Sequence, residues 1–230
     1  MEAINEFWGA VAGAVGVVAV VAFFMLRDRS AQRRVIERAA RLLAEQLSLS
    51  SERRRGGWRL RGVVESRAVD VQLSLGYFPQ GDDDHGREFR PVLSLATRLA
   101  RSPAPRLVIY PKASHAIREM LQRFWWSVSV HPRVKLGDAE LDGCFVFRGE
   151  GARSLSEPAR HQLRREKTAT SGWGESVGSW QAQIADGHAR WRELFCVQQR
   201  QLTGHELAGH VRFRLELFTA LAASAESASR

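Results

Sequence analysis

The string that comes closest to a catalytic motif is His205-Glu206-Leu-Ala-Gly-His210. It has one residue more between its histidines than the zinc-binding motif HExxH. Around a helix, histidines at i and i+4 lie about 40° apart, whereas histidines at i and i+5 lie about 140° apart. One zinc ion cannot easily reach both. Glu206 also follows Thr203 by three residues, as in a capping box, so we interpret the two histidines as residues of a helix surface.

A second candidate is the string GESVG at 174–178, which matches the nucleophile motif G-x-S-x-G with Ser176 at its centre. Asp186 and then His205 or His210 follow in the order of an α/β-hydrolase triad. The motif requires a strand before the serine and a helix after it. Here a polar, turn-rich run precedes the serine and a predicted strand follows it. The pattern therefore favours a flexible Gly- and Ser-rich loop.

Two acidic groups complete the candidates for chemistry. Asp138, Glu140 and Asp142 alternate between two glycines and could serve acid–base catalysis if burial kept one of them protonated. The run DDDH at 82–85 could bind a hard cation, but it lacks the alternating spacing of an EF-hand loop. Turn-forming roles and a solvated loop tip explain these residues more simply. No phosphate-binding glycine motif follows a predicted strand, so we expect neither a cofactor nor a metal.

The longest apolar run is Phe7–Leu26, twenty residues without a charge. At 1.5 Å per residue a helix of this length measures about 30 Å, the thickness of the hydrocarbon core of a bilayer. We predict a single membrane-spanning helix. Gly9 and Gly13 form a small-xxx-small pair within it, which would allow two such helices to approach closely and associate.

The positive charge of the chain is concentrated just after this run. The net charge of the chain is +9. The segment Arg27–Arg61 carries +7, the residues after it carry +4, and the two glutamates before it, Glu2 and Glu6, carry −2. The positive-inside rule then places the N-terminus outside and the C-terminal bulk in the cytoplasm, at the inner membrane. Basic residues near the surface also attract anionic headgroups. The predicted lipid contacts are Arg27, Arg29, Arg33, Arg34, Arg38 and Arg41.

Nucleic acid is a weaker interpretation of this charge. Stacking platforms for single strands need aromatic side chains gathered beside basic ones. The tryptophans that lie near arginines recur at no period and fall on different predicted elements, which favours packing roles. These tryptophans are Trp125, Trp126, Trp173, Trp180 and Trp191.

The pattern after the span predicts three segments: an anchor over 1–27, a basic helix and polar linker over 28–57, and an α+β domain over 58–225. Within the second segment, the polar linker covers 48–57. Alternation predicts a hairpin from 58 to 75 and a third strand over 89–99, with a loop over 76–86 between them. Ser114 can cap a helix over 114–126. Asp186-Gly187 predicts a second hairpin. The capping box at Thr203 opens a helix that we expect to fray after Ala223. The apolar stripe predicted to be buried on this helix is Leu207, Val211, Leu215, Phe218, Leu221 and Ala222. Together these elements predict a mixed sheet with helices packed on it.

The segment Lys135–Leu163 resembles part of an uncharacterised domain family of bacterial membrane proteins. The shared pattern is a D-x-E-(F/L) turn followed by F-x-V in a strand, matched at Asp138, Glu140, Leu141, Phe145 and Phe147. Leu141 stands where an aromatic residue is usual, and one predicted span stands where two are frequent. The resemblance implies N-terminal membrane helices followed by a cytoplasmic α+β domain, and no activity.

These observations favour a membrane-tethered cytoplasmic domain that binds a partner protein or organises a membrane complex, without catalysis. Two alternatives remain. One is a membrane-anchored hydrolase that uses Ser176 or the acidic turn at 138–142. The other is a module that binds anionic lipid or nucleic acid through the arginines of 33–61.

Overall fold

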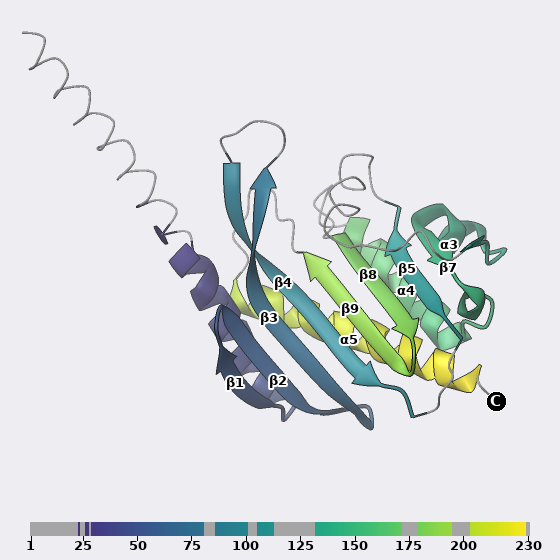
Figure 1. Ribbon diagram of the computed structural model, residues 1–230, viewed down its shortest axis with the longest axis horizontal. Helices are drawn as coiled ribbons and strands as arrows, with labels where there is room; N and C mark the ends of the chain where they lie inside the picture. The colour runs from purple at the N-terminus through teal and green to yellow at the C-terminus, as the bar shows by residue number, and fades with distance from the viewer. Residues whose placement is uncertain are drawn as a thin grey trace, which may run out of the picture.

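The computed structural model describes residues 23, 26–27, 29–80, 86–100, 105–112, 132–171, 179–194 and 203–228. Within these residues the fold is α+β: one antiparallel sheet with helices packed against it (Figure 1). The strands are β1 (Ser50–Arg54), β2 (Gly57–Val64), β3 (Arg67–Gln80), β4 (Gly86–Arg98), β5 (Leu107–Pro111), β6 (Arg133–Val134), β7 (Phe145–Arg148), β8 (Ser179–Ala185) and β9 (His188–Leu194). The helical elements are a helix over 29–46, α3 (Ala139–Cys144), the 3₁₀ turn η2 (Glu150–Ala152), α4 (Glu157–Ser171) and α5 (Gly204–Ser227).

The sheet order is β1-β2-β3-β4-β9-β8-β5-β7-β6. We expected a mixed sheet, but every pairing between the described strands is antiparallel. The long helix α5 crosses behind the sheet, and α4 lies on the same side (Figure 1). One face of the sheet is thus covered by helices, and β4, β8 and β9 alternate between buried and more exposed residues, as antiparallel strands with one covered face do. By contrast, β5 and β7 each begin with three consecutive buried residues.

Both predicted hairpins are confirmed. β2 and β3 join through Glu65 and Ser66, with φ of 49° and 63°, and β8 and β9 join through Asp186 and Gly187, with φ of 51° and 73°. Two successive positive φ values define the type I′ turn, whose twist matches that of the strands on either side. The dipeptide Asp-Gly predicts a type I′ turn from the sequence, whereas the dipeptide Glu-Ser does not.

Three local predictions are wrong. The segment 48–57, predicted as a linker, contains β1, which pairs along its length with β2. The segment 76–86, predicted as a loop, is strand up to Gln80, and β4 begins at Gly86. The acidic turn predicted at 138–142 is part of the short helix α3. The strands form because a neighbouring strand pairs with them, which overrides the local composition. The short helix α3 forms with Asp138 as its own N-cap.

The strand β4 shows how one proline is accommodated in a central strand. β9 pairs with β4 only from Val92 onward, so Pro91 pairs with Leu75 of β3 and has no partner on its other side among the described strands. Proline cannot donate a ladder hydrogen bond and is therefore confined to such edges. Beyond Pro91, β3 and β4 continue as a two-stranded arm past their neighbours (Figure 1).

The C-terminal helix is longer than predicted and more firmly held. The capping box is present, because Thr203 accepts from Glu206 N and the Glu206 side chain accepts from Thr203 N. The predicted apolar stripe is buried, namely Leu207, Val211, Leu215, Phe218, Leu221 and Ala222. The tail that we expected to fray after Ala223 is helical to Ser227, and it buries Ser224 and Ala225.

The basic helix over 29–46 packs on the same core as the strands. Ile36, Ala39, Ala40 and Leu43 are buried in it. Gly204 shows how close the contact with α5 is, because a Cβ there would lie 2.6 Å from the Cβ of Arg38. The helix is therefore part of the folded body that carries the sheet.

The predicted span Phe7–Leu26 lies outside the described residues except for Phe23 and Leu26, so Gly9 and Gly13 lie outside them too. In the described part of the chain no helix is both long and apolar enough to cross a membrane. The helix predicted over 114–126 and the loop that contains Ser176 also fall outside the described residues.

Candidate functional site

The carboxylate of Asp138 has a structural role. It accepts the backbone N–H groups of Glu140 and Leu141, each at 3.1 Å, and so caps the N-terminus of α3. It also receives a hydrogen bond of 2.8 Å from Arg164 on α4. The bond from Arg164 and these backbone bonds hold the pKa of Asp138 below its usual value. Asp138 is thus an acceptor that ties α3 to α4, and an ionised cap of this kind is a poor general acid.

Asp142 is engaged in the same way. It accepts from the backbone N–H groups of Leu136 and Gly137, at 2.9 and 3.0 Å. A cavity of about 700 Å³ opens beside it, but Asp138 and Glu140 do not line this cavity. The three acids that we considered for acid–base catalysis therefore do not converge on one pocket. The cavity is lined by Lys112, Arg133, Val134, Lys135, Gly137, Ala139, Asp142, Gly143 and Phe145.

The two histidines of the HExxH-like string face different partners. His205 lies 3.4 Å from Arg38 on the surface of the helix over 29–46. Nε2 of His210 lies 2.9 Å from Oε1 of Glu193 on β9. No group of three metal-binding side chains gathers anywhere in the described ranges. Ser176 and the acidic run at 82–85 lie outside those ranges.

The predicted lipid-contact arginines lie on the helix over 29–46 and just before it. Arg29 is half-buried and the other five are exposed, including Arg27 at the start. Arg41 forms an ion pair with Glu37 one turn earlier, at 2.5 Å. The apolar residues of this helix face the core, so the exposed arginines lie on the side away from it.

A cluster of charges that we did not predict lies inside the fold. Arg214 of α5 contacts Glu193 of β9, with Nε at 2.8 Å from Oε2 and a terminal nitrogen at 2.9 Å from Oε1. The other terminal nitrogen donates to Glu166 of α4. All three side chains are almost fully buried. Burial lowers the pKa of Arg214 to about 9, which leaves its guanidinium charged at neutral pH.

Two tryptophans complete this buried arginine cluster. Trp180 and Trp191 stack with ring centroids 4.3 Å apart and planes 15° apart. Their indole N–H groups donate to Glu166 and Glu193, at 3.1 and 3.2 Å. The guanidinium carbon lies 5.8 Å from the Trp180 ring centre and 5.4 Å from that of Trp191. The cluster therefore joins β8, β9, α4 and α5, and its tryptophans serve packing, as we inferred.

The opposite side of the same strand faces away from the helices. Trp191 and Glu193 of β9 point into the cluster, so Arg190 and Arg192 between them point outward, and both are exposed. Arg98 of β4 is exposed on this outer side too and pairs in register with His188. We call this surface the arginine face. It consists of Arg98, Arg190 and Arg192 with the neighbouring outward residues Gln72, Ser94, Gln181 and Gln183.

The acid that shares this outer side on β3, Asp70, does not neutralise these three arginines. Asp70 of β3 accepts from Nε of Arg59 at 2.9 Å and lies 3.6 Å from Arg61, so two arginines of β2 already engage it. Across the described parts of the chain, Arg98, Arg190 and Arg192 take part in no ion pair. The arginine face is thus a patch of positive charge without compensation.

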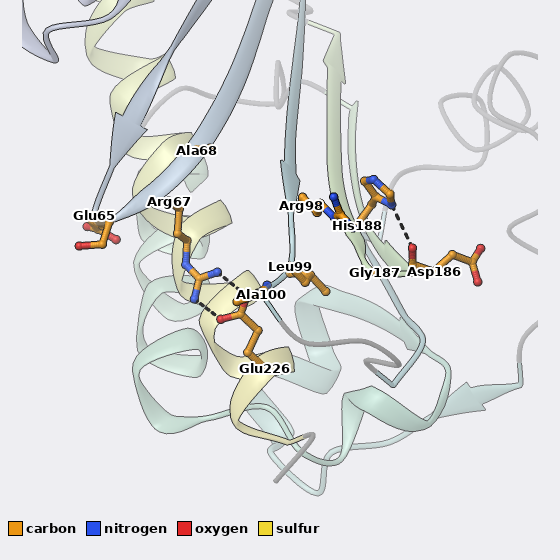
Figure 2. Close-up of a pocket in the computed structure, with 11 residues that line it drawn as sticks. Glu65, Arg67, Ala68, Arg98, Leu99, Ala100, Asp186, Gly187, His188 and Glu226 are labelled. Carbon is orange, nitrogen blue, oxygen red and sulfur yellow. Dashed lines mark hydrogen bonds and ion pairs between the residues drawn. The ribbon is translucent and has the colours of Figure 1, made fainter.

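A shallow pocket of about 590 Å³ lies at one end of this face, where the β2–β3 turn, the β8–β9 turn and the end of α5 meet. Figure 2 shows that Arg67 turns toward Glu226, to which it donates twice, at 2.8 and 2.6 Å. Arg98 and His188 lie next to each other at the rim (Figure 2). Inside the pocket Arg67 is paired with Glu226, whereas Arg98 extends the arginine face to the edge of the pocket.

Sequence reasoning missed both charged features. The run 188–192, HARWR, alternates polar or charged residues with apolar ones, which was the available signal for a strand with one basic face. It did not reveal that Glu193, charged like its neighbours, points inward toward a buried arginine. Only the position of α5 against β9 decides that.

The chain matches no protein-family model and no curated protein. The resemblance at 135–163 therefore remains a prediction. The arginine face is the feature on which a functional proposal can be based.

Proposed function

We propose that this protein is a membrane-tethered domain that binds a partner protein through the arginine face. The observation that carries the proposal is the exposure of Arg98, Arg190 and Arg192 without a carboxylate partner in the described residues. Such charge on a flat sheet steers an oppositely charged partner and selects against wrong ones. The other face of the sheet is occupied by helices, whereas Arg98, Arg190 and Arg192 on this face are exposed.

The rigidity of the surface supports a binding role. The strand β9 presents two arginines outward while its inward residues are fixed by stacking and by charge-assisted hydrogen bonds. A surface held in place before binding loses little conformational entropy when the partner arrives. The buried arginine cluster therefore supports the arginine face from below.

The membrane tether is part of the same proposal. The apolar run Phe7–Leu26 and the arginines that follow it motivate a single span with the domain on the cytoplasmic side, and the exposed arginines of the next helix suit anionic headgroups. Gly9 and Gly13 would allow self-association of two spans. Tethering raises the effective concentration of a weak binder, so a modest charged surface suffices.

The test of the tether uses cell fractionation. The full chain should remain in the membrane fraction after an alkaline carbonate wash, and a chain without residues 1–26 should be released. The anchor proposal fails if the full chain is washed off as readily as the shortened one. Protease added outside intact cells should leave the C-terminal domain uncut.

The test of the binding surface uses a photo-crosslinking amino acid placed at Gln183, on the arginine face, with Arg153, the residue that follows η2, as the control position. We expect one specific crosslinked product from Gln183, absent from the control. The charge-reversal pair R190E and R192E should abolish it, while R153E and R212E, with the same total change of charge on exposed residues elsewhere, should not. Equal crosslinking from both positions would contradict the proposal.

A further inference from the structure

The spacing of charge on the arginine face is the spacing of an extended strand. Arg190 and Arg192 lie two residues apart on β9, so their Cα atoms are separated by about 6.7 Å. A partner segment in the extended conformation repeats its side chains on one side at the same interval. Carboxylates at every second position would therefore meet the two arginines in register. A helical partner would place acids on one side at intervals of three and four residues instead.

The third arginine lies on the neighbouring strand. Arg98 pairs with His188, which precedes Arg190 by two residues, so Arg98 is the diagonal neighbour of Arg190. Diagonal cross-strand neighbours remain within reach of long side chains. The three guanidinium groups thus belong to one patch that covers two strands. Arginine suits this task because its planar fork binds a carboxylate through two parallel hydrogen bonds.

The residues around the arginines suit a peptide rather than a nucleic acid. Gln181 and Gln183 on β8 point outward beside Arg192 and Arg190, and amide groups donate to and accept from a peptide backbone. Gln72 on β3 also points outward, with Ser94 of β4 between it and Arg192. Binding of single strands relies on aromatic rings that stack on bases. Trp180 and Trp191, the tryptophans of these strands, are both fully buried on the other side of the sheet.

We infer that the segment which binds the arginine face is an extended acidic peptide with a carboxylate at every second residue. The inference rests on the proposed function and adds to it the chemistry and conformation of the partner. The peptide lies along β9, its carboxylates face Arg190 and Arg192, and Arg98 binds a further carboxylate or the end of the segment. The backbone of the peptide forms hydrogen bonds with the side-chain amides of Gln181 and Gln183 on β8.

The test measures binding of synthetic peptides to the full chain, held in nanodiscs of neutral phosphatidylcholine, by fluorescence anisotropy. One peptide alternates glutamate and serine. A second has the same composition with the glutamates in one block, so that an extended chain presents only half of them to one side. A third probe is labelled oligothymidylate. The protein variants are R190E with R192E, and the control pair R153E with R212E.

We expect the alternating peptide to bind several-fold more tightly than the block peptide. The R190E and R192E pair should weaken its binding by about tenfold, which corresponds to about 1.4 kcal/mol for the two reversed contacts together. The control pair should leave it unchanged, and added salt should weaken it. The far-UV spectrum of the R190E and R192E variant should match that of the original chain, because both arginines are exposed.

Equal affinity for the two peptides would overturn the inference, because the register of the carboxylates would then not matter. Tighter binding of oligothymidylate than of either peptide would overturn it in favour of a nucleic-acid partner. If no peptide binds while the crosslink from Gln183 still depends on Arg190 and Arg192, the inference fails and the proposed function stands. If the crosslink is absent as well, both fail.

Discussion

Arg214 and Glu193 form a buried ion pair between the last helix and the strand that carries the arginine face. Nε of Arg214 lies 2.8 Å from Oε2 of Glu193, and their side chains are 1% and 0% exposed. Removing two charges from water is costly, and their attraction offsets the cost only with good geometry and further hydrogen bonds. Glu166 and the two indole N–H groups supply those bonds. The pair therefore specifies how α5 docks on β9.

The first prediction concerns this pair. Replacing Arg214 with Met should destabilise the fold by about 3–5 kcal/mol, because Glu166 and Glu193 would be left buried without a positive partner. Urea unfolding measures the loss. The matched control is Arg212→Met, since Arg212 lies on the same helix and is exposed, and it should change stability by less than about 0.5 kcal/mol. A similar loss in the free energy of unfolding for the two variants would show that the buried ion pair does not contribute more to stability than an exposed arginine of the same helix.

The second prediction concerns the end of α5. Glu226 accepts two hydrogen bonds from Arg67 and one of 2.7 Å from the backbone N–H of Ala100. Replacing it with Gln should cost about 2 kcal/mol, because a largely buried arginine loses its charged partner. Glu216→Gln is the control, since its contact with Arg165 is long and exposed. Thermal unfolding of both variants decides whether the end of α5 contributes to global stability.

The third prediction concerns acid. The hydrogen bond from Arg59 lowers the pKa of Asp70 below its ordinary value of 3.8. A lowered carboxyl pKa contributes stability that is fully present above the unfolded value and is lost as the pH falls through the folded value. Asp70→Asn should therefore cost about 1 kcal/mol at neutral pH. The difference from the original chain should shrink below pH 3.8, in unfolding curves recorded at several pH values. A difference that is constant with pH would contradict this.

The fourth prediction concerns the capping box. Thr203→Ala removes the acceptor for Glu206 N and should cost about 1 kcal/mol. Thr203→Ser keeps the hydroxyl oxygen and should cost much less. Chemical unfolding monitored by circular dichroism compares the two. A large loss in the serine variant would indicate that the methyl group, rather than the cap, stabilises this end of the helix.

Features that depend on a few neighbouring residues were predictable from the sequence. Asp186-Gly187 specifies a hairpin because those residue types accept positive φ. Thr203 and Glu206 specify a helix start because the cap involves only residues one turn apart. The buried stripe of α5 follows from its period of 3.6. Alternation likewise predicted that residues of β3 point to opposite faces of a sheet.

Features that depend on distant partners were not predictable. The polar run at 50–54 becomes a strand only because β2 offers its edge. The small and polar end of α5 stays ordered because Ser224 accepts from Ser156 N, at 2.7 Å, and because Glu226 accepts from Arg67. The composition of the tail does not reveal whether the fold supplies such partners, so it could not distinguish a frayed end from an ordered one.

The arginine face also has one part that the sequence could predict and one part that it could not. The sequence by itself determined that β9 alternates, and hence that Arg190 and Arg192 share one side while Trp191 and Glu193 share the other. Only the tertiary structure decided which side is buried, because that depends on where α5 places Arg214. The carboxylate of Glu193 can be buried only beside that guanidinium, and the arginines on the opposite side then face outward. Local periodicity is a property of the chain, whereas the choice of the buried face is made by the helix that packs against it.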